Sequence, residues 1–187
     1  MTQSRIPLVT DPPPEAREVL ERTPLRDGAP LNIFGALAHH PRLLRRFSAM
    51  GGELLQSGLL PPRDREIVVL RVGWRRGSVY EFGQHTLIGA AAGLAAGEID
   101  ALATHDAAGA SWSESDRLCI EAADQLCATG DVSDDTWARL AAGYDTAQLV
   151  ELLLLAGFYI MVSGFLRSTR VPLDDGVPGW PKGTKPA

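Results

Sequence analysis

Proline and glycine divide this chain into short segments, and nearly every segment between them has the residue pattern of an α-helix. The 187 residues include 13 prolines and 19 glycines. Hydroxyl and acidic residues at 113–116 and 133–135 are typical helix starts, and Gly130 follows the end of a segment. Aromatic residues make up only 6% of the chain, so the core relies on Leu, Val, Ile and Ala, which favours helices over strands. The sequence therefore predicts an all-α fold.

The expected helices follow one another with short connections, and no strand is predicted. Ser78 is the expected N-cap of one helix, with Glu81 at its capping-box position. Asp145 is expected to cap the last helix. The helices are predicted at residues 13–22, 31–38, 42–56, 62–74, 79–92, 95–104, from the cap at 113–116 to 128, 136–142 and 146–168.

The length of the chain fits one domain built from two halves. Residues 1–30 are expected to form an N-terminal arm with a short helix, and residues 31–110 a half that carries the motif described below. Residues 111–169 are expected to form the second helical half of the same domain. Residues 170–187 are rich in Pro, Gly and Lys without periodicity, which predicts an extended arm or a frayed tail.

Charge and hydropathy narrow the class of protein. The formal net charge is -5 and the pI is near 5.3, which argues against a nucleic-acid partner. The first ten residues lack the basic flank and apolar core of a signal peptide. The most apolar stretch, 152–166, is shorter than the roughly 20 residues of a membrane span and contains Gly157 and Gly164. We therefore expect a cytoplasmic protein without a membrane partner, and a buried core helix at 152–166.

The two cysteines, Cys119 and Cys127, do not form a redox or zinc motif. Their separation of two helical turns differs from that of a Cys-x-x-Cys pair. On one helix their Cα atoms would lie about 12 Å apart, which is too far for a disulfide. We expect two reduced thiols on one helix face, in keeping with a cytoplasmic setting.

Polar side chains concentrate in the otherwise apolar helix expected at 79–92. Glu81 and His85 are four residues apart and therefore lie on one helix face, and Tyr80 and Gln84 form the neighbouring row. Polar groups on a buried face have to satisfy one another or bind something. This segment is therefore the candidate functional site.

The spacing of these residues resembles the signature of the carboxymuconolactone decarboxylase and alkyl hydroperoxidase D superfamily. Glu66 is followed after eleven residues by Ser78, after two more by Glu81 and after three more by His85. The hydroperoxidase branch has the same spacing, with cysteines at the positions of Ser78 and Glu81. Residues 32–41, 92–99 and 133–137 are also similar to the family, so that the resemblance covers about residues 31–173. It implies an alkyl hydroperoxidase D-like helical bundle that forms a homo-oligomer.

The resemblance implies catalytic roles for Glu66, Glu81 and His85. Because the cysteines are replaced, it favours a carboxymuconolactone decarboxylase-like lyase, a cofactor-free acid–base enzyme acting on a small carboxylated or lactone-like compound. His85 would be the acid or base, with a carboxylate to orient it. Arg71 or Arg65 could receive an anionic substrate through two hydrogen bonds. The further candidates for substrate binding are Tyr80, His39 and Gln84.

Several alternatives remain at this stage. One is a peroxidase with peroxiredoxin-type activity, and another is a non-catalytic oligomeric module whose helix 146–168 forms a subunit interface. Glu81 and His85 could be a helix-stabilising pair, and His39 an ordinary helix cap. Glu66, Glu81, His85 and a histidine of the 39–40 pair could in principle bind a metal. No metal and no cofactor is expected, because a Glu-x-x-x-His spacing alone is weak evidence.

Overall fold

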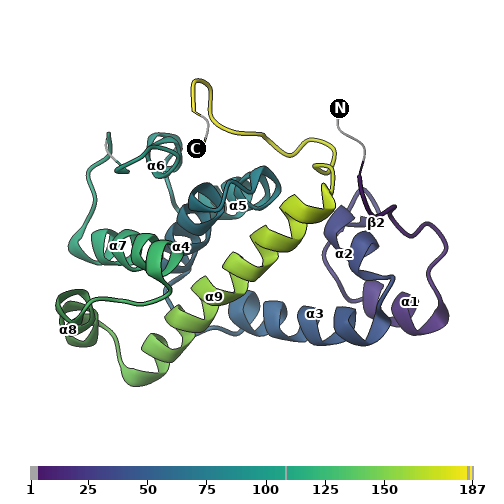
Figure 1. The fold of residues 1–187 in the computed structure, drawn as a ribbon, viewed down its shortest axis with the longest axis horizontal. Coiled ribbons are helices and arrows are strands. Elements are labelled where there is room, and N and C mark those ends of the chain that lie inside the picture. Colours follow the sequence, from purple (N-terminus) through teal and green to yellow (C-terminus); the bar gives the residue numbers. More distant parts are fainter. Residues whose placement is uncertain (1–3, 108, 185, 187) are drawn as a thin grey trace. The chain divides into compact units, whose positions relative to one another are not determined.

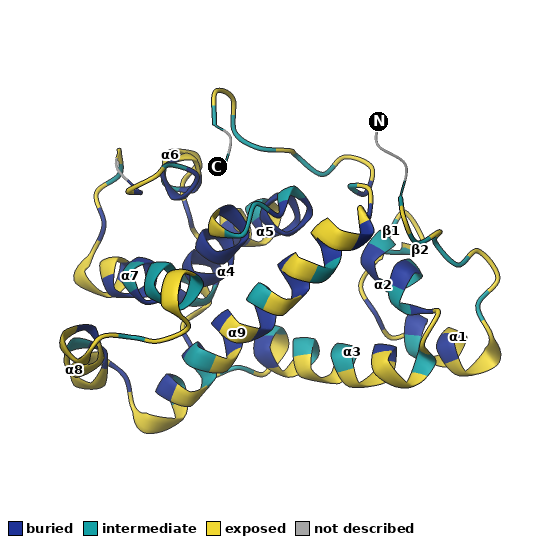
Figure 2. Ribbon diagram, in the orientation of Figure 1, coloured by how far each residue is buried: buried dark blue, intermediate teal, exposed yellow. Residues whose placement is uncertain are grey.

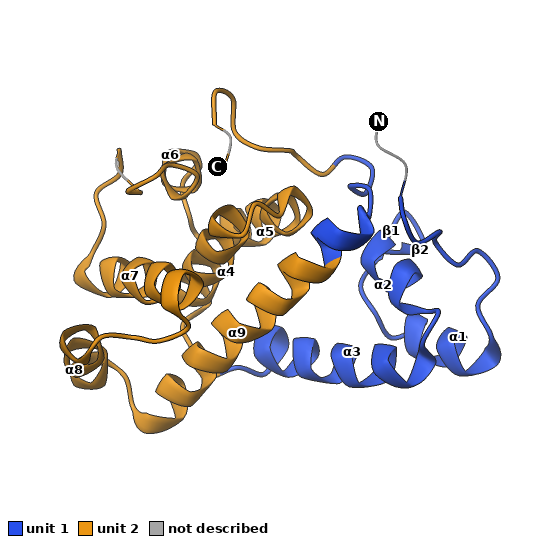
Figure 3. Cartoon of the chain, viewed as in Figure 1, with its two compact units in different colours: residues 1–58, 166–176 blue, residues 59–165, 177–187 orange. Residues whose placement is uncertain are grey.

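The structure is a computed structural model that describes residues 4–107, 109–184 and 186. Residues 1–3 of the expected arm, residue 108 and residues 185 and 187 of the expected tail lie outside the described residues. The chain divides into two compact units (Figure 3). The first comprises Met1–Gly58 and Leu166–Gly176, and the second comprises Leu59–Phe165 and Val177–Ala187.

The first unit is a small helical cluster with a short hairpin. The long amphipathic α3 packs against α1 and α2, and its core contains Ala16, Leu20, Ala38 and Leu44. Its elements are α1 (Pro14–Leu20), β1 (Leu25–Arg26), β2 (Ala29–Pro30), α2 (Asn32–Leu37) and α3 (Pro41–Gln56).

The hairpin corrects the prediction that the chain contains no strand. Leu25 pairs with Pro30, and Arg26 with Ala29, in antiparallel register. The two turn residues Asp27 and Gly28 both have positive φ, at 51° and 80°, and an Asp-Gly pair is a strong signal for such a turn. The strands are only two residues long, too short to show an alternating pattern.

The second unit is built around α4, which carries the candidate site together with α5. Residues 66–74 of α4 are all buried, because α5 and α7 pack along it and α6 adds further cover (Figures 1 and 2). α4 is therefore buried on more than one side. The unit contains α4 (Pro62–Arg75), α5 (Val79–Ala91), α6 (Ala96–Leu102), α7 (Glu114–Thr129), α8 (Asp134–Gly143) and α9 (Thr146–Thr169), whose last turn belongs to the first unit.

The all-α prediction is confirmed, and the local signals for helix starts hold at three positions. Ser113 and Ser133 accept hydrogen bonds from the backbone N–H groups three residues later, at 3.1 and 3.3 Å. Asp145 accepts one from Gln148 N at 2.8 Å. Hydrogen bonds of this kind satisfy amide groups that have no partner inside the helix.

The described part of the tail is extended and not frayed. Trp180 packs at the edge of Trp74, with ring centroids 5.4 Å apart, and against Phe82 at 5.1 Å. In the first unit, Asp174 accepts a hydrogen bond from Asn32 N at 2.8 Å. The lack of periodicity correctly indicated the absence of a helix, but it could not reveal these contacts.

The helix α9 is the one helix of the described chain that is long and apolar enough to cross a membrane. Its most apolar window has a mean hydropathy of 2.1, and half of this window is buried inside the protein. Core helices of soluble proteins have the same character, so the cytoplasmic location stays a prediction.

Candidate functional site

A chain of hydrogen-bonded charges connects α4 to α5. Nδ1 of His85 lies 2.6 Å from Oε2 of Glu66, and its Nε2 lies 3.2 Å from Oε1 of Glu81. Arg65 donates from Nε to Oε1 of Glu66 at 2.9 Å. Glu66 is completely buried, and His85 and Glu81 are only 3% and 5% exposed. The structure therefore brings together the three residues that the sequence singled out as catalytic.

Two glycines allow α4 and α5 to approach closely enough for this contact. At Gly73 of α4 an added Cβ would lie 3.3 Å from the backbone N of Phe82. At Gly89 of α5 it would lie 3.2 Å from Leu70 and 3.7 Å from the Cβ of Glu66. Larger residues here would separate the helices, and short side chains at such contacts are what permit close packing.

The two carboxylates favour the protonated form of His85. Burial by itself lowers the pKa of His85, but the charge of Glu66 and hydrogen bonds to Glu66 and Glu81 outweigh it and raise this pKa to about 10. Burial likewise raises the pKa of Glu66, but His85 and Arg65 outweigh it and hold this pKa below its usual value. Near neutral pH His85 is therefore an imidazolium that donates a hydrogen bond from each ring nitrogen.

Tyr159 of α9 covers His85 and was not identified from the sequence. Its ring meets the imidazole edge-to-face, with centroids 5.0 Å apart and planes at 82°, and it is buried. Burial and the nearby charges of Glu81 and Glu66 raise the pKa of Tyr159 well above its ordinary value, so the phenol stays protonated. A tyrosine in an apolar helix far along the chain carries no sequence signal for this contact.

Comparison with known proteins agrees with the geometry. Residues 41–124 match the model of the carboxymuconolactone decarboxylase family, and this range includes Glu66, Glu81 and His85. Over this range, which is less than half of the 187 residues, the chain is similar to that family. No curated protein matches the chain.

Three solved structures share the fold of this chain at low sequence identity. An uncharacterized peroxidase-related protein from Ralstonia eutropha JMP134, described as an alkylhydroperoxidase AhpD core, aligns with a TM-score of 0.79 at 19% identity and covers 94% of both chains. A second peroxidase-related protein, from Silicibacter sp. TM1040, aligns with a TM-score of 0.80 at 18% identity, over 96% of this chain and 98% of its own. A protein of unknown function from Agrobacterium tumefaciens aligns with a TM-score of 0.67 at 16% identity, over 74% of this chain and 94% of its own. At these identities the likeness shows the fold alone.

The local capping pattern did not predict the role of the Ser78 side chain correctly. Ser78 occupies the N-cap position of α5, but its side chain makes no capping hydrogen bond, and its buried Oγ has no hydrogen-bond partner among the described residues. Glu81, expected at the capping-box position, pairs with His85 instead. The tertiary contact between α4 and α5 thus takes over the side chain that the local pattern assigned to the cap.

The structure corrects the prediction that Arg71 binds substrate. Arg71 is fully buried, and its five N–H groups are all used. It donates twice to Asp124 of α7, at 2.6 and 2.8 Å, and its other donors meet the carbonyls of Leu102, Thr104 and His105 at 2.6–2.9 Å. Arg71 therefore connects α4, α7 and the end of α6, and has no donor left for a ligand.

The remaining candidates for substrate binding lie in different parts of the chain. Tyr80 and Gln84 are buried on α5, beside Glu81 and His85 in the sequence. His39 belongs to the first unit, where its Nε2 lies 2.8 Å from the carbonyl oxygen of Pro7. Roles of all three in substrate binding stay predictions.

The two cysteines are free and lie on α7. Cys119 is buried, and Cys127 is partly buried. Burial raises the pKa of Cys119 to about 12 and that of Cys127 to about 11. Neither is therefore a thiolate near neutral pH, and a thiol is a poor nucleophile.

Proposed function

We propose that this chain is a cofactor-free acid–base enzyme of the lyase type, acting on a small carboxylated or lactone-like compound. The observation that carries the proposal is the position of His85, whose two nitrogens connect Glu66 and Glu81 inside a buried site. A histidine hydrogen-bonded to two carboxylates in this way can hold a proton and transfer it, which is the requirement of acid–base catalysis. The match to the carboxymuconolactone decarboxylase family suggests the substrate class.

His85, Glu66 and Glu81 have different roles, which follow from their charges and contacts. The pKa of His85 is raised to about 10, so the imidazole is protonated near neutral pH and can act as a proton donor. Glu66 is held by both Arg65 and His85 and orients the imidazole. Glu81 meets only Nε2 of His85 among the described residues, so it is the carboxylate that exchanges a proton with the substrate.

In a decarboxylation, these roles supply the proton that replaces the carboxyl group of the substrate. The bond between the substrate carbon and its carboxyl group breaks, and CO₂ leaves. The electron pair stays on the substrate carbon, conjugated with the lactone carbonyl. That carbon then takes a proton from His85 by way of Glu81, and solvent restores the proton of His85 afterwards.

Arg65 is the arginine suited to bind the carboxylate of the substrate. Only its Nε is engaged, with Glu66, and the two Nη groups have no hydrogen-bond partner among the described residues. Its side chain is 12% exposed. A guanidinium with two free donors on one side can hold a carboxylate through a pair of hydrogen bonds.

The test compares two reactions of the whole purified chain. We expect CO₂ release from carboxymuconolactone or a related carboxylated lactone, and no consumption of an organic peroxide in the presence of a dithiol reductant. The opposite pattern would establish the peroxidase function instead. His85→Gln and Glu81→Gln should each lower kcat by about 100-fold or more, whereas Arg65→Gln should mainly raise KM.

Glu53→Gln serves as the matched control, because Glu53 is exposed on α3 and belongs to the first unit. Its rate should equal that of the parent, and circular dichroism should show unchanged helix content in every variant. An undiminished rate in both His85→Gln and Glu81→Gln would show that this cluster is structural.

A further inference from the structure

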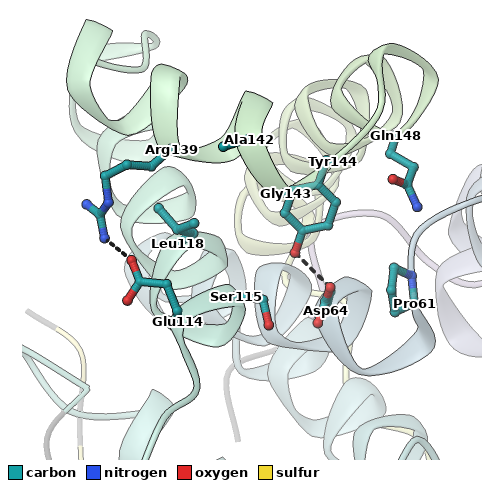
Figure 4. A pocket seen from close by; sticks show the side chains of 10 residues that line it. All are labelled: Pro61, Asp64, Glu114, Ser115, Leu118, Arg139, Ala142, Gly143, Tyr144 and Gln148. Atoms are coloured by element: carbon teal, nitrogen blue, oxygen red, sulfur yellow. Dashed lines mark hydrogen bonds and ion pairs between the residues drawn. The ribbon is translucent and has the colours of Figure 1, made fainter.

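A cavity of about 440 Å³ opens on the opposite side of α4 from His85. Asp64 lines it, and Asp64 and Glu66 are two residues apart on α4, so their side chains leave the helix in nearly opposite directions. The cavity lies between the start of α4, α7, α8 and the start of α9 (Figure 4). Its volume falls in the range of small-molecule sites. None of the residues of the proposed acid–base site lines it.

The polar end of the cavity is a carboxylate held in place from one side. The Tyr144 hydroxyl donates to Oδ2 of Asp64 at 2.7 Å, as Figure 4 shows. Because that proton is used, the S–H of Cys119 is the donor in its 3.3 Å contact with the Tyr144 oxygen. The second oxygen of Asp64, Oδ1, has no hydrogen-bond partner among the described residues.

Asp64 is only 7% exposed and forms no ion pair within the described chain. Its neighbour Arg63 is directed to Glu98, at 2.6 Å, and Asp116, at 3.0 Å. A buried carboxylate without a counter-ion is costly, and a bound cation would remove much of that cost. Burial also raises the pKa of Asp64 above its usual value, because it disfavours the charged form of the carboxyl group.

The rim of the cavity does not offer a positive charge to a ligand. Arg139 lines the cavity but pairs with Glu114 at 2.6 Å, as Figure 4 shows, and with Glu121 at 3.1 Å. Asp135 lies within 3.8 Å of the same guanidinium. Arg117 lies 3.6 Å from Glu114, so three carboxylates face two arginines at this end, and an anionic ligand would be repelled.

The walls between these polar ends are apolar, formed by Pro61, Leu118 and Ala142. We propose that the cavity binds a small organic cation, an alkylammonium with a short hydrocarbon chain, whose N–H groups donate to Asp64. The hydrocarbon part lies against Leu118 and Pro61. This site is separate from the acid–base site and does not depend on the reaction proposed for it.

The experiment titrates the whole chain with butylammonium chloride by isothermal titration calorimetry. Butanol and sodium butyrate serve as neutral and anionic probes of the same length. We expect saturable binding of butylammonium, with butanol and butyrate at least tenfold weaker. Equal binding of butanol, a preference for butyrate, or no saturable binding of butylammonium below about 10 mM would overturn the proposal.

Two variants test the position of the site. Asp64→Asn keeps the shape and an acceptor for Tyr144 but removes the charge, so affinity for butylammonium should fall at least tenfold. Ala142→Phe places a ring in the cavity without changing any charge and should also abolish binding. Ala141→Phe is the matched control, because Ala141 is exposed on the same helix but does not line the cavity.

Circular dichroism shows whether each variant folds. If Asp64→Asn does not fold, the comparison of Ala142→Phe with Ala141→Phe decides alone. Unchanged affinity in Ala142→Phe, or in a folded Asp64→Asn, would mean that Asp64 serves only to hold Tyr144.

Discussion

At the scale of single residues, His85 shows how the surroundings of a side chain change its chemistry. Its position four residues after Glu81 is visible in the sequence, but the decisive partner is Glu66 on another helix. With a carboxylate at each nitrogen, the pKa of the imidazole is raised to about 10. The group that resembled a neutral-pH base is therefore an acid with its proton in place.

This raised pKa predicts that the chain loses stability as the pH rises. The pKa of His85 is about 10 in the folded chain and about 6.5 when unfolded. The stabilisation is therefore complete below about pH 6.5, declines above it and is lost by about pH 10, by up to about 1.4 kcal/mol per pH unit. Urea unfolding followed by circular dichroism between about pH 7 and 8.5 measures this slope.

The His85→Gln variant should show a flatter dependence in the same window. The window stops near pH 8.5 because Cys119 and Cys127, whose pKa values are also raised, add a loss of stability at higher pH. His40→Gln is the control, since His40 is exposed on the first unit, and it should keep the slope of the parent. Identical slopes in parent and His85→Gln would contradict the ion pairs described for His85.

At the scale of secondary-structure elements, local signals and long-range contacts had different predictive value. Helix starts at Ser113, Ser133 and Asp145 depend on side chains within one turn, and all three were predicted. Ser78 has the same local pattern, but the packing of α5 on α4 buries its hydroxyl and engages Glu81 elsewhere. A cap can be read from the sequence only where no tertiary contact competes for its side chains.

The packing of the tail on α5 makes a prediction for Gly83. A Cβ at this position would overlap the carbonyl oxygen of Pro178 and lie 2.9 Å from Val177. Gly83→Ala should therefore displace the tail or strain α5, at a cost of about 1–3 kcal/mol. The free energy of unfolding measures the cost, and a red shift of tryptophan fluorescence reports the release of Trp180 from Trp74.

Gly97→Ala provides the comparison for Gly83→Ala. Gly97 is exposed in α6, and a Cβ there would meet no atom within 4 Å. This change should be neutral or stabilise the chain by about 0.5–1 kcal/mol, because alanine favours a helix. If Gly83→Ala behaves in the same way, the tail does not pack on α5 in solution.

At the scale of the whole molecule, α9 presents an apolar stripe that the single chain does not cover. Val150, Leu154 and Met161 are each more than half exposed, and Gly157 lies between them at helical spacing. Stripes of this kind commonly form contacts between helices. The homo-oligomer expected from the sequence remains a proposal, with α9 as its interface.

Light scattering after size-exclusion chromatography tests this proposal. The parent should have a mass of at least two chains, and the double substitution Leu154→Glu, Met161→Glu should lower it toward one, because buried charge opposes association. Leu43→Glu is the control, since Leu43 is similarly exposed but lies on α3 of the first unit. A monomeric parent, or an unchanged mass in the double variant, would contradict the proposal.

The sequence by itself was sufficient for the helical class and for the helix bounds to within a few residues. These features depend on periodicity and caps, which are local in the chain. The choice of Glu66, Glu81 and His85 came from the resemblance to a known family, and their catalytic roles stay predictions. The Asp27-Gly28 turn is also a local signal, but its strands are too short to show an alternating pattern, so the hairpin was not predicted.

Only the tertiary structure decided which charges meet and which are committed elsewhere. All N–H donors of Arg71 are used in hydrogen bonds, whereas the Nη groups of Arg65 stay available. Tyr159 packs on His85, and a cavity lies beside Asp64. These outcomes depend on packing between residues far apart in the chain, and on burial, which strengthens the interactions between charges. Neither the packing nor the burial can be deduced from the spacing of residues along the sequence.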